Sequence, residues 1–158
     1  MLPIRVILHP TDFSEGSGCA FQFACALARD YGARLVLIHV TPTPIVPVPF
    51  VTIPAEPVDV REKLLEQLAN MRSSDSILTM ERHLKEGDPA TEILQFAEHI
   101  RCDLIVMGTH GRTGLGRLFV GSVAEQVLRK ASCAVLTVKN PVAVASSQAD
   151  SRRRAATV

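Results

Sequence analysis

Features that direct a protein to a membrane, to secretion or to a polyanion are missing from this sequence. It contains no run of 18 apolar residues, and residues 1–5 lack the basic, apolar and small-residue regions of a signal peptide. The formal net charge is only +1 over 158 residues, which excludes a dedicated binder of nucleic acid or another polyanion. We therefore expect a cytosolic protein that binds neither nucleic acid nor membranes.

Patterns typical of metal sites and of P-loop enzymes are also missing. The cysteines show no C-x-x-C spacing and lie in apolar segments, which favours free thiols packed as small hydrophobic side chains: Cys19, Cys25, Cys102 and Cys133. The five histidines, His9, His39, His83, His99 and His110, show no spacing typical of a zinc site, and a lone histidine at a strand end favours a structural role. No G-x-x-x-x-G-K-[ST] pattern occurs, so a P-loop nucleotidase is excluded.

The length and composition fit one globular domain. With 158 residues and 47% apolar content, the chain can bury a single core. Residues 141–158 are rich in Ala, Ser and Arg without apolar periodicity, so we expect a domain over residues 1–140 and a mobile tail over residues 141–158. The Arg152–Arg154 cluster in this tail is typical of a solubilising end, and we assign it no function.

Short apolar segments alternate with amphipathic segments along the whole domain. Strands are expected at residues 4–8, 35–40, 77–84, 103–108 and 134–138, and helices at 14–31, 58–73, 89–100 and 122–131. This alternation is typical of right-handed βαβ units, and it predicts an α/β fold, a doubly wound sandwich with a five-stranded parallel sheet. Residues 41–57 hold six of the ten prolines and are expected to form a long extended loop.

Helical spacing of apolar residues predicts the buried face of each helix. The predicted positions are Ala20, Phe23, Ala24, Leu27 and Ala28 in the first helix, Leu64, Leu68 and Met71 in the second, Ile93, Phe96, Ala97 and Ile100 in the third, and Ala124, Val127, Leu128 and Ala131 in the fourth. Gly32 is expected to end the first helix, and Asp88 to cap the third.

Glycine is concentrated in one place. Five of the nine glycines lie within residues 108–121, where they form the pattern G-x2-G-x9-G-S between an expected strand and an expected helix. Glycines allow backbone N–H groups to point into one concavity, and a helix N-terminus favours an anion, so the segment predicts a phosphate site. An alternative is that Ser122 only caps its helix, because Ser122 and Glu125 form a capping box.

Ligands of doubly wound sheets bind outside the carboxyl ends of the strands, where the strand order reverses. The segments at those ends are His9–Ser14, Val40–Pro44, Leu84–Asp88 and Met107–Gly121. A nucleotide site is therefore expected at this edge of the sheet.

The sequence resembles the universal stress protein family over residues 4–139. The likeness rests on Pro10-Thr11-Asp12-Phe13-Ser14 after the first strand and on the segment from Gly108 to Glu125, whose glycine pattern marks the ATP-binding branch of that family. The resemblance implies a Rossmann-like sandwich of strand order 3-2-1-4-5. It also implies binding of ATP, ADP or AMP with Mg²⁺ coordinated by the phosphates and water, a role in stress and growth arrest, and a homodimer through strand five, Ala134–Val138.

The resemblance also implies roles for individual residues. Asp12 and the backbone of Val40, with Pro10 and Thr11 beside them, correspond to the adenine contacts, and Met107 and Gly108 to the ribose region. The phosphate cradle then corresponds to His110, Gly111, Gly121, Ser122 and Val123. An alternative for Asp12 is a capping role at the first helix, with Glu15 three residues on. His110, Arg112 and Arg117 are either counter-charges for phosphate or solvated.

Two classes of function fit these residues. The first is a nucleotide-responsive regulator whose state is read by a protein partner that the sequence does not identify. The second is a slow ATPase or nucleotidyl transferase. The absence of Asp and Glu between Gly108 and Gly121 favours binding over turnover, because catalysis needs a general base or a metal-binding carboxylate near the phosphates.

Overall fold

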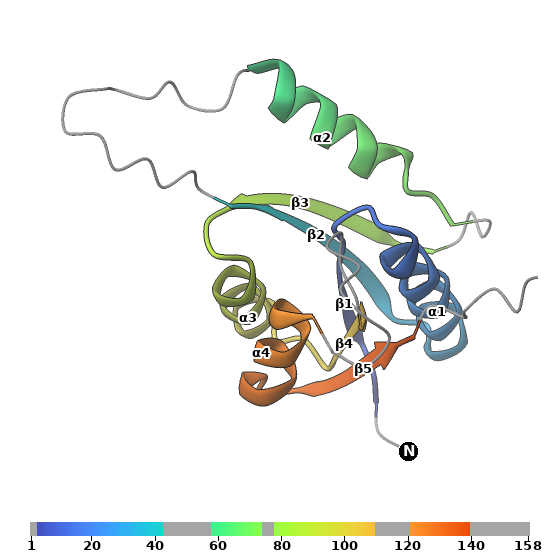
Figure 1. Ribbon diagram of the computed structural model, residues 1–158. Helices are drawn as coiled ribbons and strands as arrows, with labels where there is room; N and C mark the ends of the chain where they lie inside the picture. Colours follow the sequence, from blue (N-terminus) through green and yellow to red (C-terminus); the bar gives the residue numbers. More distant parts are fainter. Residues whose placement is uncertain (1–2, 43–57, 74–77, 110–120, 140–158) are drawn as a thin grey trace, which may run out of the picture.

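The computed structural model describes residues 3–42, 58–73, 78–109 and 121–139 (Figure 1). The elements run in the order β1 (Val6–Pro10), α1 (Glu15–Tyr31), β2 (Arg34–Thr41), α2 (Val58–Asn70), β3 (Met80–Glu86), α3 (Pro89–His99), β4 (Leu104–Gly108), α4 (Ser122–Lys130) and β5 (Ala134–Val138). The strands form one sheet of order β3-β2-β1-β4-β5, and every neighbouring pair is parallel. The predicted fold class and strand order are confirmed.

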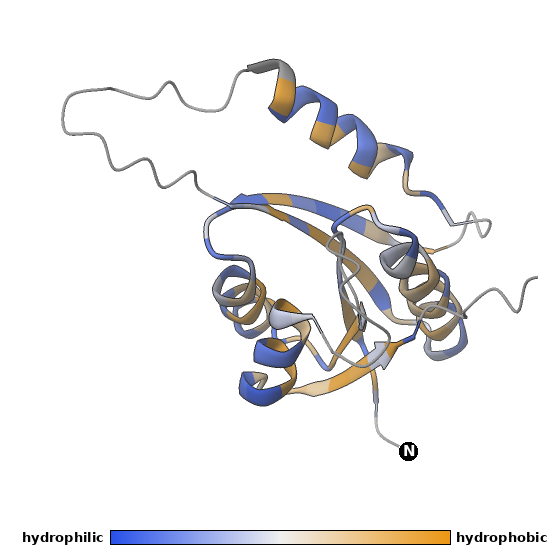
Figure 2. Ribbon diagram, in the orientation of Figure 1, coloured by the Kyte–Doolittle hydropathy of each residue, from blue (hydrophilic) through white to orange (hydrophobic). Residues whose placement is uncertain are grey.

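The two faces of the sheet are covered by different helices (Figure 1). Alternate strand residues such as Ile7, Leu37 and Val106 form a core with α1 and with Leu68 of α2. The residues between them, such as Leu8, Ile38 and Ile105, form a second core with α3 and α4. Alternation of side chains along each strand therefore produces the two apolar layers, to which strand residues coloured as hydrophobic in Figure 2 contribute.

Strands β1 and β3 end two residues later than the apolar runs indicate. The expected strand at residues 4–8 is Val6–Pro10, and the one at residues 77–84 is Met80–Glu86. Pro10 fits the end of a strand because the β1–β2 pairing continues without its missing N–H: Thr11 N–H donates to the Ile38 carbonyl at 2.9 Å.

The predicted helix faces are confirmed at most positions and wrong at two. Phe23 is 55% exposed and Leu128 is 51% exposed. On α1 the buried face is rotated toward Gly16, Ser17 and Phe21. The first turn of α1 packs closely against the end of β4, where a Cβ on Gly108 would lie 3.0 Å from the Gly16 backbone.

The helix ends and the cysteines follow the sequence-based expectations. Gly32 adopts a left-handed conformation (φ 63°) at the C-terminus of α1, and the Asp88 side chain caps α3. All four cysteines are free thiols, and two of them, Cys25 and Cys102, are buried in the cores. Burial raises the pKa of Cys102 to about 12, so this thiol stays protonated.

Three expected features lie outside the described residues. They are the proline-rich segment beyond Pro42, the glycine-rich segment 110–120 and the tail 141–158. Within the described ranges, no helix combines the length and the apolar character needed to cross a membrane.

Candidate functional site

A crevice opens where β1 and β4 separate. The two strands pair at Ile7–Leu104 and Leu8–Ile105, and Pro10 has no N–H with which to extend the ladder. At this point the imidazole of His9 links the two strands by a hydrogen bond, with Nδ1 2.8 Å from the Val106 carbonyl oxygen. Because a carbonyl can only accept, Nδ1 carries the hydrogen and donates it. The strand order reverses here, at the position where ligands of such sheets bind.

The imidazole ring of His9 is uncharged in the folded protein. Its side chain is fully buried, and burial lowers its pKa from 6.5 to about 4, against the opposing effects of the Val106 hydrogen bond and the Asp12 charge. At neutral pH the ring is therefore uncharged. The structural role favoured for a strand-end histidine is confirmed for His9.

A pocket of about 610 Å³ lies at the carboxyl ends of the strands, a size typical of small-molecule sites. Nine of the eleven predicted site residues line it: Pro10, Thr11, Asp12, Val40, Met107, Gly108, Gly121, Ser122 and Val123. The other two, His110 and Gly111, lie outside the described residues. The pocket therefore brings together predicted residues from four separate segments of the chain.

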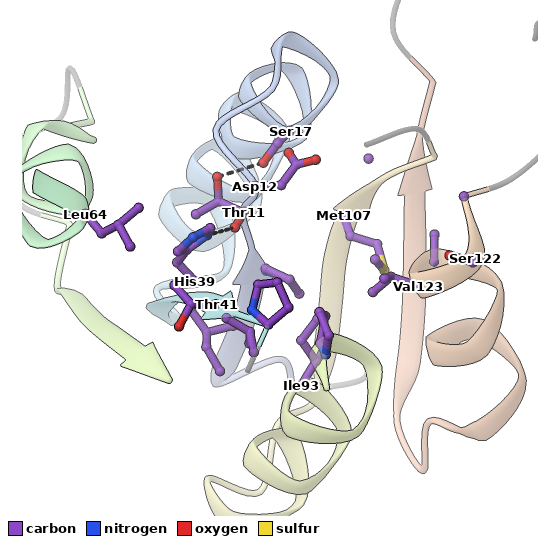
Figure 3. A pocket seen from close by; sticks show the side chains of 18 of the residues that line it. Thr11, Asp12, Ser17, His39, Thr41, Leu64, Ile93, Met107, Ser122 and Val123 are labelled. Atoms are coloured by element: carbon purple, nitrogen blue, oxygen red, sulfur yellow. Dashed lines mark hydrogen bonds between the residues drawn. The ribbon is translucent and has the colours of Figure 1, made fainter. Parts of the chain in front are cut away.

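The walls of the pocket come from elements on both of its sides (Figure 3). Thr11, Asp12, Ser17 and His39 lie on one side with Leu64 of α2, while Met107, Ser122 and Val123 lie on the other. Several wall residues were not predicted from the sequence: Ser17, Ile38, His39, Thr41, Pro42, Val60, Leu64, Pro89, Ile93, Thr109 and Ala124. Of these, Thr41, Pro42 and Thr109 were not named individually but lie in the segments expected at the strand ends, whereas Val60 and Leu64 depend on where α2 packs.

The turn between β1 and α1 is held by its own side chains. Oδ1 of Asp12 accepts hydrogen bonds from Ser14 N (3.0 Å) and Ser14 Oγ (2.6 Å), and Ser14 Oγ accepts from Ser17 N as the N-cap of α1. The alternative that Asp12 caps the helix is therefore wrong, because Ser14 is the cap and Asp12 orients it. Asp12 is the one carboxylate among the described residues that line the pocket.

The N-terminus of α4 differs from those of α1 and α3. Ser14 and Asp88 cap α1 and α3 with their side chains, whereas the N-cap of α4 is Gly121 and no side chain caps it. The capping box predicted at Ser122 is therefore wrong. By helix geometry, the N–H groups of Ser122 and Val123 have no acceptor within α4, and they lie at the positive end of the helix dipole. Such an end is suited to an anion.

The position of this helix end is set by β4 and β5. Gly121 N–H donates to the Thr109 carbonyl at 2.7 Å, and Thr109 N–H donates to the Val138 carbonyl at 3.0 Å. The two ends of the glycine-rich segment, Thr109 and Gly121, are thus joined directly. Gly108 is required for a different reason than ligand contact, because a Cβ at this position would lie 3.0 Å from the carbonyl carbon and oxygen of Gly16.

Metal ligands are not gathered in the described part of the chain. No three His, Cys, Asp or Glu side chains lie together there as a metal site would need. With an uncapped helix end, apolar walls and one carboxylate, the pocket combines donors for an anionic group with a slot for an apolar or aromatic one.

Comparison with known proteins gives consistent results. Residues 3–139 match the sequence profile of the Universal stress protein family. A universal stress protein of Methanocaldococcus jannaschii is 37% identical over 148 residues, which cover 87% of this chain and 83% of that protein. A solved protein of the universal stress protein family from Burkholderia pseudomallei has a TM-score of 0.65 and 32% identity, over 87% of this chain and 98% of its own.

A more distant solved structure shares the fold. The universal stress protein from Archaeoglobus fulgidus in complex with dAMP has a TM-score of 0.61 and 23% identity, over 88% of this chain and 100% of its own. The match of the family profile to nearly the whole domain, together with these relatives, is sufficient to place the sequence. The chain belongs to the universal stress protein family.

Proposed function

We propose that the pocket binds an adenine nucleotide, ATP, ADP or AMP, and that the protein is a cytosolic, nucleotide-responsive regulator in the stress response. The observation that carries the proposal is the uncapped N-terminus of α4, which presents backbone N–H groups to a pocket at the switch point of the sheet. A nucleotide has the phosphates for this end and the flat base for the apolar slot.

The phosphates are assigned to the α4 side of the pocket. Gly121 allows close approach of the backbone, and Ser122 and Val123 supply N–H donors. His110 and Gly111, from the segment between Gly108 and Gly121, complete the cradle in this proposal. Mg²⁺ would be coordinated by the phosphates and water, consistent with the lack of clustered metal ligands among the described residues.

The base and ribose are assigned to the β1, β2 and β4 ends. Asp12 accepts a hydrogen bond from the adenine, the backbone of Val40 with Pro10 and Thr11 lines the base, and Met107 and Gly108 adjoin the ribose. The complex of the Archaeoglobus fulgidus protein with dAMP gives a precedent for an adenine nucleotide on this fold. The extension to this chain rests on its own pocket residues.

Binding without rapid turnover fits the pocket better than catalysis does. The carboxylate of Asp12, the one acidic group among its described lining residues, is held by two hydrogen bonds to Ser14 and lies across the pocket from Ser122 and Val123 (Figure 3). A hydrolytic enzyme would place such a group beside the phosphates. The alternative, a slow ATPase or nucleotidyl transferase, would reveal itself as product formed during the binding experiment.

A homodimer through β5 is part of the proposal. In the described part of the chain, β5 is an edge strand whose one partner is β4, and its sequence, Ala134–Val138, contains no charged residue. Natural edge strands that stay unpaired carry charges or proline, so an apolar edge needs cover. A second copy of the same strand would supply it, and an unidentified partner protein would read the nucleotide state of this dimer.

Calorimetric titration of the purified protein with ATP, ADP and AMP tests the binding proposal. We expect saturable heat and a raised melting temperature. Gly121→Val, which places a branched side chain at the phosphate approach, should weaken binding while the fold survives, since the φ of −58° at this residue suits any L-amino acid. Gly18→Val, at a glycine with open space around it, is the matched control. Absence of heat and of a thermal shift with all three nucleotides would refute the proposal.

A further inference from the structure

Thr11 is the residue after β1, and its main-chain carbonyl accepts a hydrogen bond from a side chain. Thr11 N–H still pairs with the Ile38 carbonyl, but the Thr11 carbonyl oxygen lies 2.7 Å from Nδ1 of His39. A carbonyl only accepts, so Nδ1 of His39 carries the hydrogen. A side chain of β2 thus supplies a donor to the first residue of the turn that leads into α1.

His39 also supports the next part of this turn. Its ring lies against the ring of Phe13, with 4.5 Å between centroids. Phe13 has a φ of 63°, a left-handed conformation that is strained for a bulky residue and persists only when its surroundings fix it. His39 is 7% exposed and therefore has little freedom to move. The ring holds both residues that flank Asp12 in the sequence.

Ser17 fastens the same turn from α1. Ser17 Oγ donates to Thr11 Oγ1 at 2.8 Å, and Thr11 Oγ1 also accepts from Phe13 N–H at 3.1 Å. Figure 3 shows the two links to Thr11, one from Ser17 and one from His39, on the side of the pocket where Asp12 lies. The backbone around Asp12 is therefore tied to α1 by a hydroxyl and to β2 by an imidazole.

We propose that His39 is a positioning residue of the nucleotide site: by holding the Thr11 carbonyl and the Phe13 ring, it fixes the turn that aims the Asp12 carboxylate at the base. The inference rests on the proposed function, since it concerns the same pocket. His39 contacts the turn and is not required to contact the nucleotide.

The layout of the pocket gives the inference a specific consequence. The turn lies on the α1 and α2 side, and the uncapped end of α4 lies on the opposite side (Figure 3). Loss of the His39 contacts should therefore weaken recognition of the adenosine part. Binding of a polyphosphate that has no base should remain, because its donors on α4 are pinned through Thr109 and Val138.

Three substitutions of His39 distinguish the effect of its N–H donor from the effect of the volume of its ring. His39→Asn keeps an N–H donor at the same number of bonds from the backbone as Nδ1, His39→Gln moves the donor one bond further, and His39→Leu removes it. His83→Leu is the matched control, because His83 lies on β3 beside Ile38 and does not line the pocket.

The experiment titrates each variant with ATP and with inorganic tripolyphosphate, with circular dichroism to confirm folding. We expect His39→Leu and His39→Gln to bind ATP about tenfold more weakly, the effect of losing about one hydrogen bond. We expect His39→Asn to stay within about threefold of the wild type, and all variants to keep their tripolyphosphate affinity. Where the Leu variant does not fold, the Asn and Gln pair decides the question.

Three results would overturn the inference. They are equal ATP affinity in the Asn and Gln variants, a parallel loss of ATP and tripolyphosphate affinity in the folded variants, and the same loss of ATP affinity in His83→Leu. A wild type that binds tripolyphosphate but not ATP would instead remove the proposed function and the inference together, and the wild-type titration alone shows this.

Discussion

Two buried histidines, His9 and His39, lie next to the points where β1 stops pairing with β4 and with β2. Each uses Nδ1 to donate to a carbonyl oxygen, that of Val106 for His9 and that of Thr11 for His39. Buried carbonyl groups without a partner are costly, so these rings let the strands separate without leaving such groups unsatisfied. The hydrogen bond of His9 is therefore part of the reason that a pocket can exist between β1 and β4.

The depressed pKa of His9 predicts acid sensitivity. The fold favours the neutral ring, with a pKa of about 4, whereas the unfolded chain takes up the proton at about 6.5. Stability from the neutral ring is therefore complete above pH 6.5 and decreases as the pH falls toward 4, by roughly 3 kcal/mol in total. Urea unfolding at pH 7 and pH 4.5 measures it.

His9→Asn is the comparison for this measurement, because it retains a donor near Nδ1 but does not titrate. The free energy of unfolding of the variant should fall less between the two pH values than that of the wild type. Equal losses in the two proteins would show that carboxylates, and not His9, cause the acid sensitivity.

At the level of secondary structure, three of the helices that line the pocket, α1, α3 and α4, differ in how their N-termini are satisfied. α1 and α3 are complete in the protein alone, since Ser14 and Asp88 cap them, and the Thr91 hydrogen bonds lower the pKa of Asp88. α4 has no such cap. A helix N-terminus whose N–H groups have no side-chain cap and face a pocket is suited to binding an anionic ligand.

This difference predicts opposite results for two serine substitutions. Ser14→Ala should lower the free energy of unfolding by about 0.5–2 kcal/mol, because it removes an N-cap. Ser122→Ala should change it by less than about 0.5 kcal/mol, because Ser122 does not cap α4. Chemical denaturation without nucleotide gives both values. A loss at Ser122 as large as that at Ser14 would restore the capping-box interpretation.

Much of the fold could be predicted from the sequence, because buried parallel strands and amphipathic helices have distinct apolar patterns. The exposed Phe23 and Leu128 show the limit of that pattern. The spacing of apolar residues predicts which of them share one face of a helix. How that face is turned toward the sheet depends on tertiary contacts, such as the close approach of Gly108 to Gly16 in α1. The capping-box interpretation of Ser122 is wrong for a related reason: Gly121, whose N–H donates to the Thr109 carbonyl, is the N-cap of α4.

The candidate site was predictable where it follows strand ends and glycines, which explains the nine predicted residues that line the pocket. The contribution of α2 was not, because it depends on packing of a helix that follows residues 43–57. Arg82 of β3 secures this helix by donating to the carbonyls of Leu68 and Met71, both at 2.8 Å. No local pattern in the sequence indicates that contact.

At the scale of the whole molecule, the two edges of the sheet differ in character. β3 carries five charged or titratable residues in its sequence MERHLKE, whereas β5 reads AVLTV. Charges on an edge strand discourage pairing with another chain, and β5 has none. This asymmetry directs the proposed self-association to the β5 edge.

A charge placed on β5 should therefore separate the proposed dimer. Leu136 is 37% exposed on this strand, and Leu136→Lys adds a charge to the edge that would pair. Light scattering should give about twice the chain mass of 17.2 kDa for the wild type and the mass of one chain for the variant. A wild type that remains monomeric at high concentration, or a variant that remains dimeric, would contradict the assignment.

We propose above that an adenine nucleotide binds with its phosphates at the N-terminus of α4. The most direct test follows the backbone amide resonances of isotope-labelled protein by NMR while ATP is added. We predict that the largest shifts occur at the Ser122 and Val123 amides, whose N–H groups lack an acceptor within the helix, and that smaller shifts occur at Asp12 and Val40. Saturation with ATP that leaves the Ser122 and Val123 resonances unmoved would contradict the account.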